Sequence, residues 1–118
     1  MDLNILVVDD DDCYSGLFKA FLEYKKDWKL HIADSPTKAM VILKETSIDV
    51  IVSDLKMSPM NGMVFLSQVS MSFPKTVRIL LTGQPINKLL PSYIHFQFEK
   101  GNFSIKDLVN KVNKQLED

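Results

Sequence analysis

Short, nearly continuous runs of apolar residues alternate in this chain with stretches whose apolar residues recur at helical spacing. Strands that are apolar on both faces and separated by helices are typical of a parallel sheet covered on both sides. The sequence therefore predicts a doubly wound, five-stranded α/β domain. Its expected strands are Asn4–Val8, Lys29–Ala33, Val50–Ser53, Val77–Leu81 and Ile94–Phe98.

The segments between the expected strands carry helix signals, with one exception. Ser35-Pro36 and Ser104 are typical of helix starts, and apolar residues recur at helical spacing in 17–22, 39–43, 65–69 and 105–116. Between the fourth and fifth strands, Pro85 could begin a helix, but Pro91 would end it within about two turns. We expect this fourth helix to be short, distorted or absent.

Composition limits the function classes. The chain has 118 residues, which predicts one domain over 1–118, and its net charge of −1 gives no electrostatic reason to bind nucleic acid or an anionic membrane. It shows neither a signal-peptide pattern nor a run of about 18 apolar residues that could span a membrane. The single cysteine, Cys13, fits a reducing compartment, so we expect a cytoplasmic protein.

Polar residues follow four of the expected strands. The aspartates Asp9 to Asp12 follow the first strand, and Asp54 follows the third. Thr82 and Lys100 come after the fourth and fifth strands. Each has an ordinary structural explanation, such as a solvated loop or an Asx-turn. Because parallel sheets bind ligands beyond the carboxyl ends of their strands, the four together predict a functional site at one sheet edge.

These residue types suit the phosphorylation of a carboxylate. Crowded carboxylates repel one another unless a cation compensates, and Mg²⁺ typically binds one or two carboxylates together with phosphate oxygens. A side-chain carboxylate can attack phosphorus to form an aspartyl phosphate. The ammonium of Lys100 would neutralise the transferring group, and the Thr82 hydroxyl can donate a hydrogen bond to it. The predicted cofactor is Mg²⁺, with Mn²⁺ as an alternative.

Over nearly its whole length the chain resembles the receiver domain of two-component response regulators. The matching segments are Ile5–Asp10, Asp49–Asp54, Met57–Gly62, Leu80–Gly83 and Phe98–Lys100. The resemblance implies a flavodoxin-like three-layer sandwich that accepts a phosphoryl group from a histidine kinase or histidine phosphotransfer protein. It further implies signalling to an unidentified downstream effector through a conformational change. No enzymatic activity is implied beyond self-catalysed phosphotransfer and autodephosphorylation.

The resemblance also implies residue roles. Asp54 would be the phospho-acceptor, and Asp10, Asp54 and the backbone carbonyl of Lys56 would bind Mg²⁺. Asp9 would hold a metal-bound water. Thr82 and Lys100 would contact the phosphoryl group. Asp11 and Asp12 match no role in the family and are expected to be loop and helix-start residues.

Two positions would modulate hydrolysis of the aspartyl phosphate. Lys56 lies two residues after the acceptor, and Gln84 lies two residues after Thr82. In the family, side chains at these positions influence attack by water on the phosphoryl group. A lysine at the first position could pair with phosphoryl oxygens and lengthen the lifetime of the phosphate. Pointing into solvent is the alternative for its side chain.

The residue after Lys100 departs from the family pattern. The family has a proline there, in a cis bond, but Gly101 stands in this chain. A cis bond before a non-proline residue costs about 3–4 kcal/mol, so we expect Lys100–Gly101 to be trans. The permissive backbone of glycine could still aim the lysine inward. A second departure is Met57-Ser58-Pro59, where the proline is shifted by one residue.

The residues that would form the output surface also depart from the family pattern. The switch aromatic of the family corresponds to Gln97, and the neighbouring Phe96 and Phe98 should point to the opposite sheet face. The segment between Thr82 and Lys100 is also shorter than usual. We therefore expect intact phosphorylation chemistry and an altered output surface.

Three other classes remain open. The main alternative is a receiver-fold interaction module that is not phosphorylated, which the unusual Lys100-Gly101 pair keeps in view. A phosphohydrolase of the haloacid-dehalogenase type would need a second acid where Lys56 stands. A flavodoxin-like cofactor binder is disfavoured because Asp9 to Asp12 would repel a phosphate.

Overall fold

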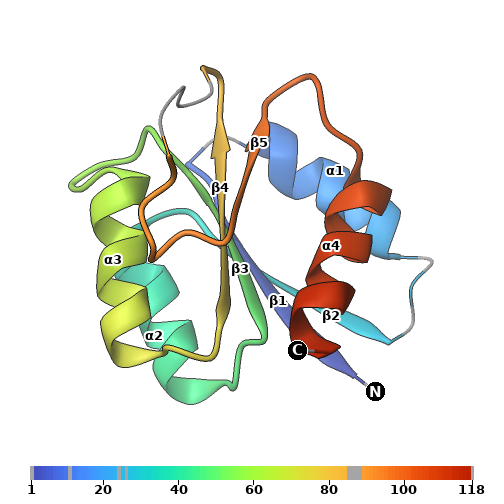
Figure 1. The fold of residues 1–118 in the computed structure, drawn as a ribbon, viewed down its shortest axis with the longest axis horizontal. Helices are drawn as coiled ribbons and strands as arrows, with labels where there is room; N and C mark the ends of the chain where they lie inside the picture. The colour runs from blue at the N-terminus through green and yellow to red at the C-terminus, as the bar shows by residue number, and fades with distance from the viewer. Residues whose placement is uncertain (1, 11, 24, 26, 85–88, 118) are drawn as a thin grey trace.

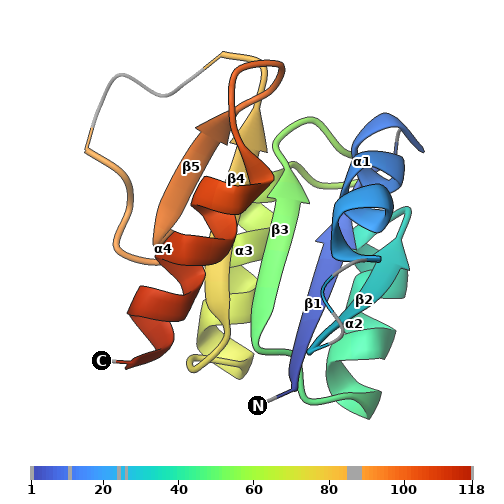
Figure 2. The same cartoon turned by 90° about the vertical axis from the view of Figure 1, so that its right-hand side faces the viewer.

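One five-stranded parallel sheet forms the centre of the molecule, as the sequence predicts. The computed structural model describes residues 2–10, 12–23, 25, 27–84 and 89–117 (Figure 1). The strand order is β2-β1-β3-β4-β5, and Figure 2 shows the strands side by side in this order. The strands are β1 (Leu3–Val8), β2 (Trp28–Ala33), β3 (Val50–Asp54), β4 (Val77–Thr82) and β5 (Phe96–Glu99). The helices are α1 (Asp12–Leu22), α2 (Pro36–Glu45), α3 (Gly62–Ser72) and α4 (Ile105–Glu117).

Helices cover both faces of the sheet. Helices α1 and α4 lie on one face, and α2 and α3 lie on the other (Figure 1). Strand β1 illustrates why the strands read as continuous apolar runs. Ile5 and Val7 pack into the cluster with α1 and α4, while Leu6 and Val8 pack into the cluster with α2 and α3. Both faces of a central parallel strand must therefore be apolar.

The predicted helix starts are confirmed. The Ser35 hydroxyl accepts a hydrogen bond of 3.2 Å from the Lys38 amide, and Pro36 is the first residue of α2. Ser104 accepts one of 3.3 Å from the Asp107 amide at the start of α4. Asp12 is the first residue of α1, whereas Asp11 lies outside the described residues. In the part of the chain that the structure describes, no helix is long and apolar enough to cross a membrane.

The connection between β4 and β5 contains no helix in its described residues, which are 83–84 and 89–95. The expected helix start at Pro85 lies outside them. The prediction that the fifth strand begins at Ile94 is wrong, because β5 begins at Phe96. The Ile94 amide donates to the Pro91 carbonyl at 3.0 Å. This turn takes the Ile94 amide out of the sheet ladder, so regular pairing starts later. The other strands begin or end within one residue of the predicted bounds.

Arg78 ties this connection to the sheet. Its guanidinium is buried and donates to the carbonyls of Tyr93 at 2.7 Å, Thr76 at 2.8 Å and Pro74 at 3.1 Å. Its backbone amide donates to Nδ1 of His95 at 2.9 Å, which requires this nitrogen to carry no proton. Burial and the charge of Arg78 lower the pKa of His95, in keeping with the neutral ring.

Candidate functional site

Three carboxylates meet at the carboxyl edge of the sheet. Oxygens of Asp9, Asp10 and Asp54 lie within 4.8 Å of one another. The sheet order explains this, because β1 and β3 are neighbours and Val8 pairs with Ser53. Asp9, which follows β1, and Asp54, the last residue of β3, therefore emerge side by side. Asp9 and Asp54 are only 4% and 5% exposed, while Asp10 is open to solvent.

Lys100 reaches this acidic cluster from β5. Its Nζ lies 2.7 Å from Oδ2 of Asp54, and its backbone amide donates to the Thr82 carbonyl at 2.8 Å. Burial alone would lower the pKa of the Lys100 ammonium, but its hydrogen bond with Asp54 and the charges of Asp54 and Asp9 raise it above the ordinary value. The lysine is therefore charged at neutral pH.

The predictions for the Lys100–Gly101 bond are confirmed. Ser58–Pro59 is the cis bond found in the described part of the chain, so Lys100–Gly101 is trans. Gly101 has a φ of +78°, a left-handed conformation that residues with side chains rarely adopt. The glycine thus turns the chain away from β5 while the preceding lysine points inward.

The Thr82 hydroxyl lies at the end of β4, between the strands that carry Asp54 and Lys100. It is 2% exposed, donates to the Gln84 carbonyl at 3.0 Å and accepts from the Gln84 amide at 3.2 Å. The hydroxyl is thus engaged with the loop after β4. The sequence places Thr82 at this edge correctly, but the bonds to Gln84 were not predicted.

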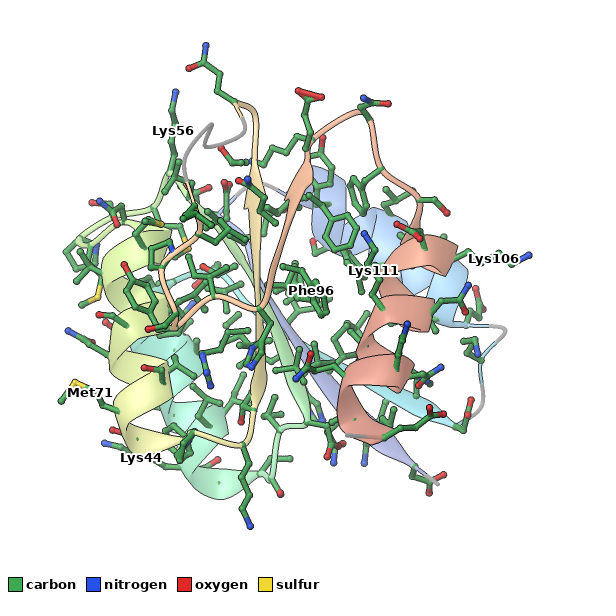
Figure 3. The ribbon with its side chains drawn as sticks, in the orientation of Figure 1. Lys44, Lys56, Met71, Phe96, Lys106 and Lys111 are labelled. Atoms are coloured by element: carbon green, nitrogen blue, oxygen red, sulfur yellow. The ribbon has the colours of Figure 1, made fainter. Side chains whose placement is uncertain are left out.

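The loop between β3 and α3 forms the other wall of the site. The Lys56 amide donates to Oδ1 of Asp54 at 3.3 Å, and the Lys56 side chain is exposed and extends away from the sheet (Figure 3). An open depression of about 520 Å³ lies beside the acidic cluster. Its lining residues are Asp10, Leu55, Lys56, Met57, Ser58 and Asn61.

Gly62 holds this loop against the end of β3. Its amide donates to the Leu55 carbonyl at 2.7 Å, and it is buried. A Cβ at this position would collide with the backbone oxygen of Asp54 and would lie 3.1 Å from Cα of Leu55. Only glycine therefore permits this approach of α3 to the end of β3.

The charge balance of the cluster suits a divalent cation. The carboxylates of Asp9, Asp10 and Asp54 lie close together, and Lys100 supplies one ammonium to them. Among the described residues, the one ammonium paired with this cluster does not balance the charge of three carboxylates. Carboxylate oxygens beside an open depression are the ligands that Mg²⁺ prefers, together with water. The donor set of this site therefore fits Mg²⁺.

The two phenylalanines of β5 face the side of the sheet that α1 and α4 cover. Phe98 belongs to the buried cluster with α1 and α4, and Phe96 packs against the same cluster. Because side chains of a strand alternate between its two faces, Gln97 points to the opposite face. The prediction that Phe96 and Phe98 point to the opposite sheet face from Gln97 is confirmed.

Tyr14 is a site neighbour that the sequence reasoning missed. Its ring centroid lies 5.2 Å from Nζ of Lys100. No motif or periodicity marks this tyrosine, which is one of three in the chain. Only the contact between α1 and the end of β5 reveals it.

A family model describing the response regulator receiver domain matches residues 5–99. Among curated proteins, the sensor kinase CckA of Brucella abortus is 29% identical over 118 residues, covering 96% of this chain and 12% of that protein. The chain spans 12% to 22% of the length of the curated relatives it matches.

Solved structures share the fold. The signal receiver domain of an HD domain-containing protein from Pseudomonas fluorescens Pf-5 has a TM-score of 0.87 and 26% identity, covering 98% of this chain and 88% of that one. The response regulator TrrA from Thermotoga maritima, solved in complex with Mg²⁺-BeF, has a TM-score of 0.82 and 23% identity, with coverage of 95% and 97%.

Proposed function

The chain belongs to the response regulator receiver domain family and is a phospho-accepting receiver domain, and we propose that Asp54 is its phospho-acceptor. One observation carries this proposal. Asp54 is a buried carboxylate at a strand end, 2.7 Å from the Lys100 ammonium and grouped with Asp9 and Asp10. We further propose that residues 1–118 make up a single receiver domain.

The proposed step is an in-line transfer to a carboxylate oxygen of Asp54. A new P–O bond forms while the bond from phosphorus to the donor breaks, and the donor leaves with that electron pair. For a phosphohistidine donor the broken bond is P–N, and the departing imidazole takes up a proton. Lys100 compensates the charge on the phosphoryl oxygens, and Thr82 would exchange its bonds with Gln84 for one to the phosphoryl group.

Mg²⁺ is the proposed cofactor, with Mn²⁺ as an alternative. Asp10, Asp54 and the backbone carbonyl of Lys56 would bind it, and Asp9 would hold one of its waters. Its role would be to neutralise charge as the phosphoryl group approaches the carboxylates. The proximity of three carboxylate side chains supports this assignment.

A histidine kinase or histidine phosphotransfer protein is the proposed donor. The similarity of 96% of this chain to part of a sensor kinase supports the proposal that this chain exchanges phosphoryl groups with such proteins. We infer that the exchange takes place in the cytoplasm and that a downstream effector reads the phosphorylated state. In this proposal the chain is not an enzyme acting on a separate substrate, and turnover is limited to its own phosphorylation and dephosphorylation.

Incubation of the chain with acetyl phosphate and Mg²⁺ tests the proposed function. Intact-protein mass spectrometry is expected to find one phosphoryl group per chain, and peptide mapping should locate it on the peptide that contains Asp54. Chelation of the metal should slow the reaction strongly, because the acidic cluster would then repel the phosphate. An unmodified chain would instead favour an interaction module, and steady phosphate release from varied esters would indicate a hydrolase.

We propose that Lys56 and Gln84 modulate hydrolysis of the aspartyl phosphate. The Lys56 side chain is exposed next to the acceptor, where an ion pair contributes about 0.2–1 kcal/mol. Lys56→Ala is therefore expected to shorten the lifetime of the phosphate by up to about five-fold. The decay of the adduct, followed by mass spectrometry, measures this. Lys44→Ala at the opposite end of the molecule is the control (Figure 3), and equal decay in both variants would refute the role of Lys56.

A further inference from the structure

Lys100 must cross the end of a strand to meet its partner. Asp54 lies on β3 and Lys100 follows β5, and β4 separates these strands in the sheet. The next residue, Gly101, turns the chain away from the sheet with a φ of +78°. A lysine side chain has many rotamers, and fixing it costs conformational entropy. The backbone of Lys100 is held by the bond from its amide to the Thr82 carbonyl, so it is the side-chain rotamer that contacts of the ammonium must select.

The ring of Tyr14 also lies against this ammonium. Nζ of Lys100 is 2.7 Å from Oδ2 of Asp54 and 5.2 Å from the centroid of the Tyr14 ring. A cation within about 6 Å of a ring centroid is attracted by the electrons of the ring face. The ammonium thus contacts both a carboxylate and an aromatic face.

The Tyr14 ring is itself supported by packing. It stacks on Phe103 with ring centroids 6.1 Å apart and an interplanar angle of 26°. The ring centroid of Phe103 lies 5.9 Å from that of Phe98 and 6.3 Å from that of Phe18. Both Phe98 and Phe18 are buried. The half-buried tyrosine is therefore the outer member of an aromatic stack that reaches into the core between α1 and α4.

We propose that Tyr14 is a positioning residue for phosphoryl transfer, whose ring face holds the Lys100 ammonium toward Asp54. This inference rests on the proposed function of Asp54 as acceptor. The aromatic contacts of Tyr14 and Phe103 hold the ring in place, and the ring in turn restricts the rotamers of the long lysine side chain. The contact uses the ring face, so a phenylalanine at position 14 preserves it and a leucine does not.

Proton NMR tests the contact without any phosphate. In the wild type and in Tyr14→Phe, the ε-methylene resonance of Lys100 is expected to shift upfield because of the ring current. In Tyr14→Leu it should move to the position of the exposed Lys44. A wild-type Lys100 resonance at the exposed-lysine position would overturn the proposed contact.

Kinetics with acetyl phosphate and Mg²⁺ test the positioning role. Tyr14→Leu is expected to form the adduct about two- to ten-fold more slowly than the wild type, which is the range of one cation–π contact. Tyr14→Phe should recover most of the rate, and Tyr93→Leu, on the opposite face of the sheet, should leave it unchanged. In a Lys100→Ala background, Tyr14→Leu should have no further effect, because its action depends on the lysine.

The outcomes separate the two proposals. If the wild-type chain accepts no phosphoryl group, the proposed function is overturned, and so is the role of Tyr14 in phosphoryl transfer. If the wild-type chain accepts one and Tyr14→Leu reacts equally fast, the Tyr14 proposal alone is overturned. An equal loss of rate in the presence and absence of Lys100 also overturns it. Thermal unfolding of each variant, followed by circular dichroism, shows whether the fold is retained.

Discussion

Asp54→Asn is expected to abolish the phosphoryl adduct formed with acetyl phosphate and Mg²⁺. The amide keeps the shape of the side chain but lacks the charged oxygen that attacks phosphorus. It also removes one of the three clustered carboxylates and the ion pair with Lys100. The backbone of Asp54 remains paired within β3 and β4, so the variant should still fold. Intact mass after incubation measures the adduct.

Asp49→Asn is the matched control for this substitution. Asp49 lies just before the same strand, at its opposite end, and its Oδ2 accepts a hydrogen bond of 2.7 Å from the Asn4 amide. An asparagine oxygen can accept the same bond, so this variant should form the adduct like the wild type. An adduct that persists in Asp54→Asn would assign phosphorylation to another residue and contradict the proposed acceptor.

Gly62→Ala is expected to destabilise the fold by about 1–3 kcal/mol or more, because overpacking a close backbone contact forces the chain apart. The added Cβ would collide with the Asp54 carbonyl oxygen, and backbone atoms cannot yield as a flexible side chain does. Urea unfolding followed by the fluorescence of the single, buried Trp28 measures the loss. The displacement would act directly on the acceptor, so adduct formation should fall as well.

Gly16→Ala is a control in which the same substitution is expected to raise stability. Nothing lies within 4 Å of a Cβ at Gly16, which is in the interior of α1. Alanine is favoured over glycine in a helix interior by roughly 0.5–1 kcal/mol, so this variant should gain stability. Equal stability of the Gly62 variant and the wild type would show that the loop adjusts without cost.

Short sequence patterns predicted where the strands lie and which sheet face their side chains occupy. The apolar runs around Ile5 and Val52 place their following aspartates at one sheet edge, because parallel strands end together. The alternation of Phe96, Gln97 and Phe98 predicted their faces for the same geometric reason. Such patterns depend on nearest neighbours in the chain, which a sequence displays directly.

Contacts between distant segments were not predictable in this way. The ring of Tyr14 beside Lys100 depends on how α1 and the end of β5 pack, and no spacing rule connects them. The bond of buried Arg78 to the Tyr93 carbonyl depends on the path of the loop between β4 and β5. The same loop forms the turn between Pro91 and Ile94, which delays the start of β5.

The strand-end origin of the site also has a consequence for folding. Asp9, Asp54, Thr82 and Lys100 lie at or just after the ends of four different strands, so their arrangement is not local in sequence. Long-range contacts of this kind form only once the loops between them have closed. A partly folded chain without a docked β5 would lack the lysine beside the acceptor. Only the completely folded domain can therefore accept a phosphoryl group. Incompletely folded chains would not be phosphorylated.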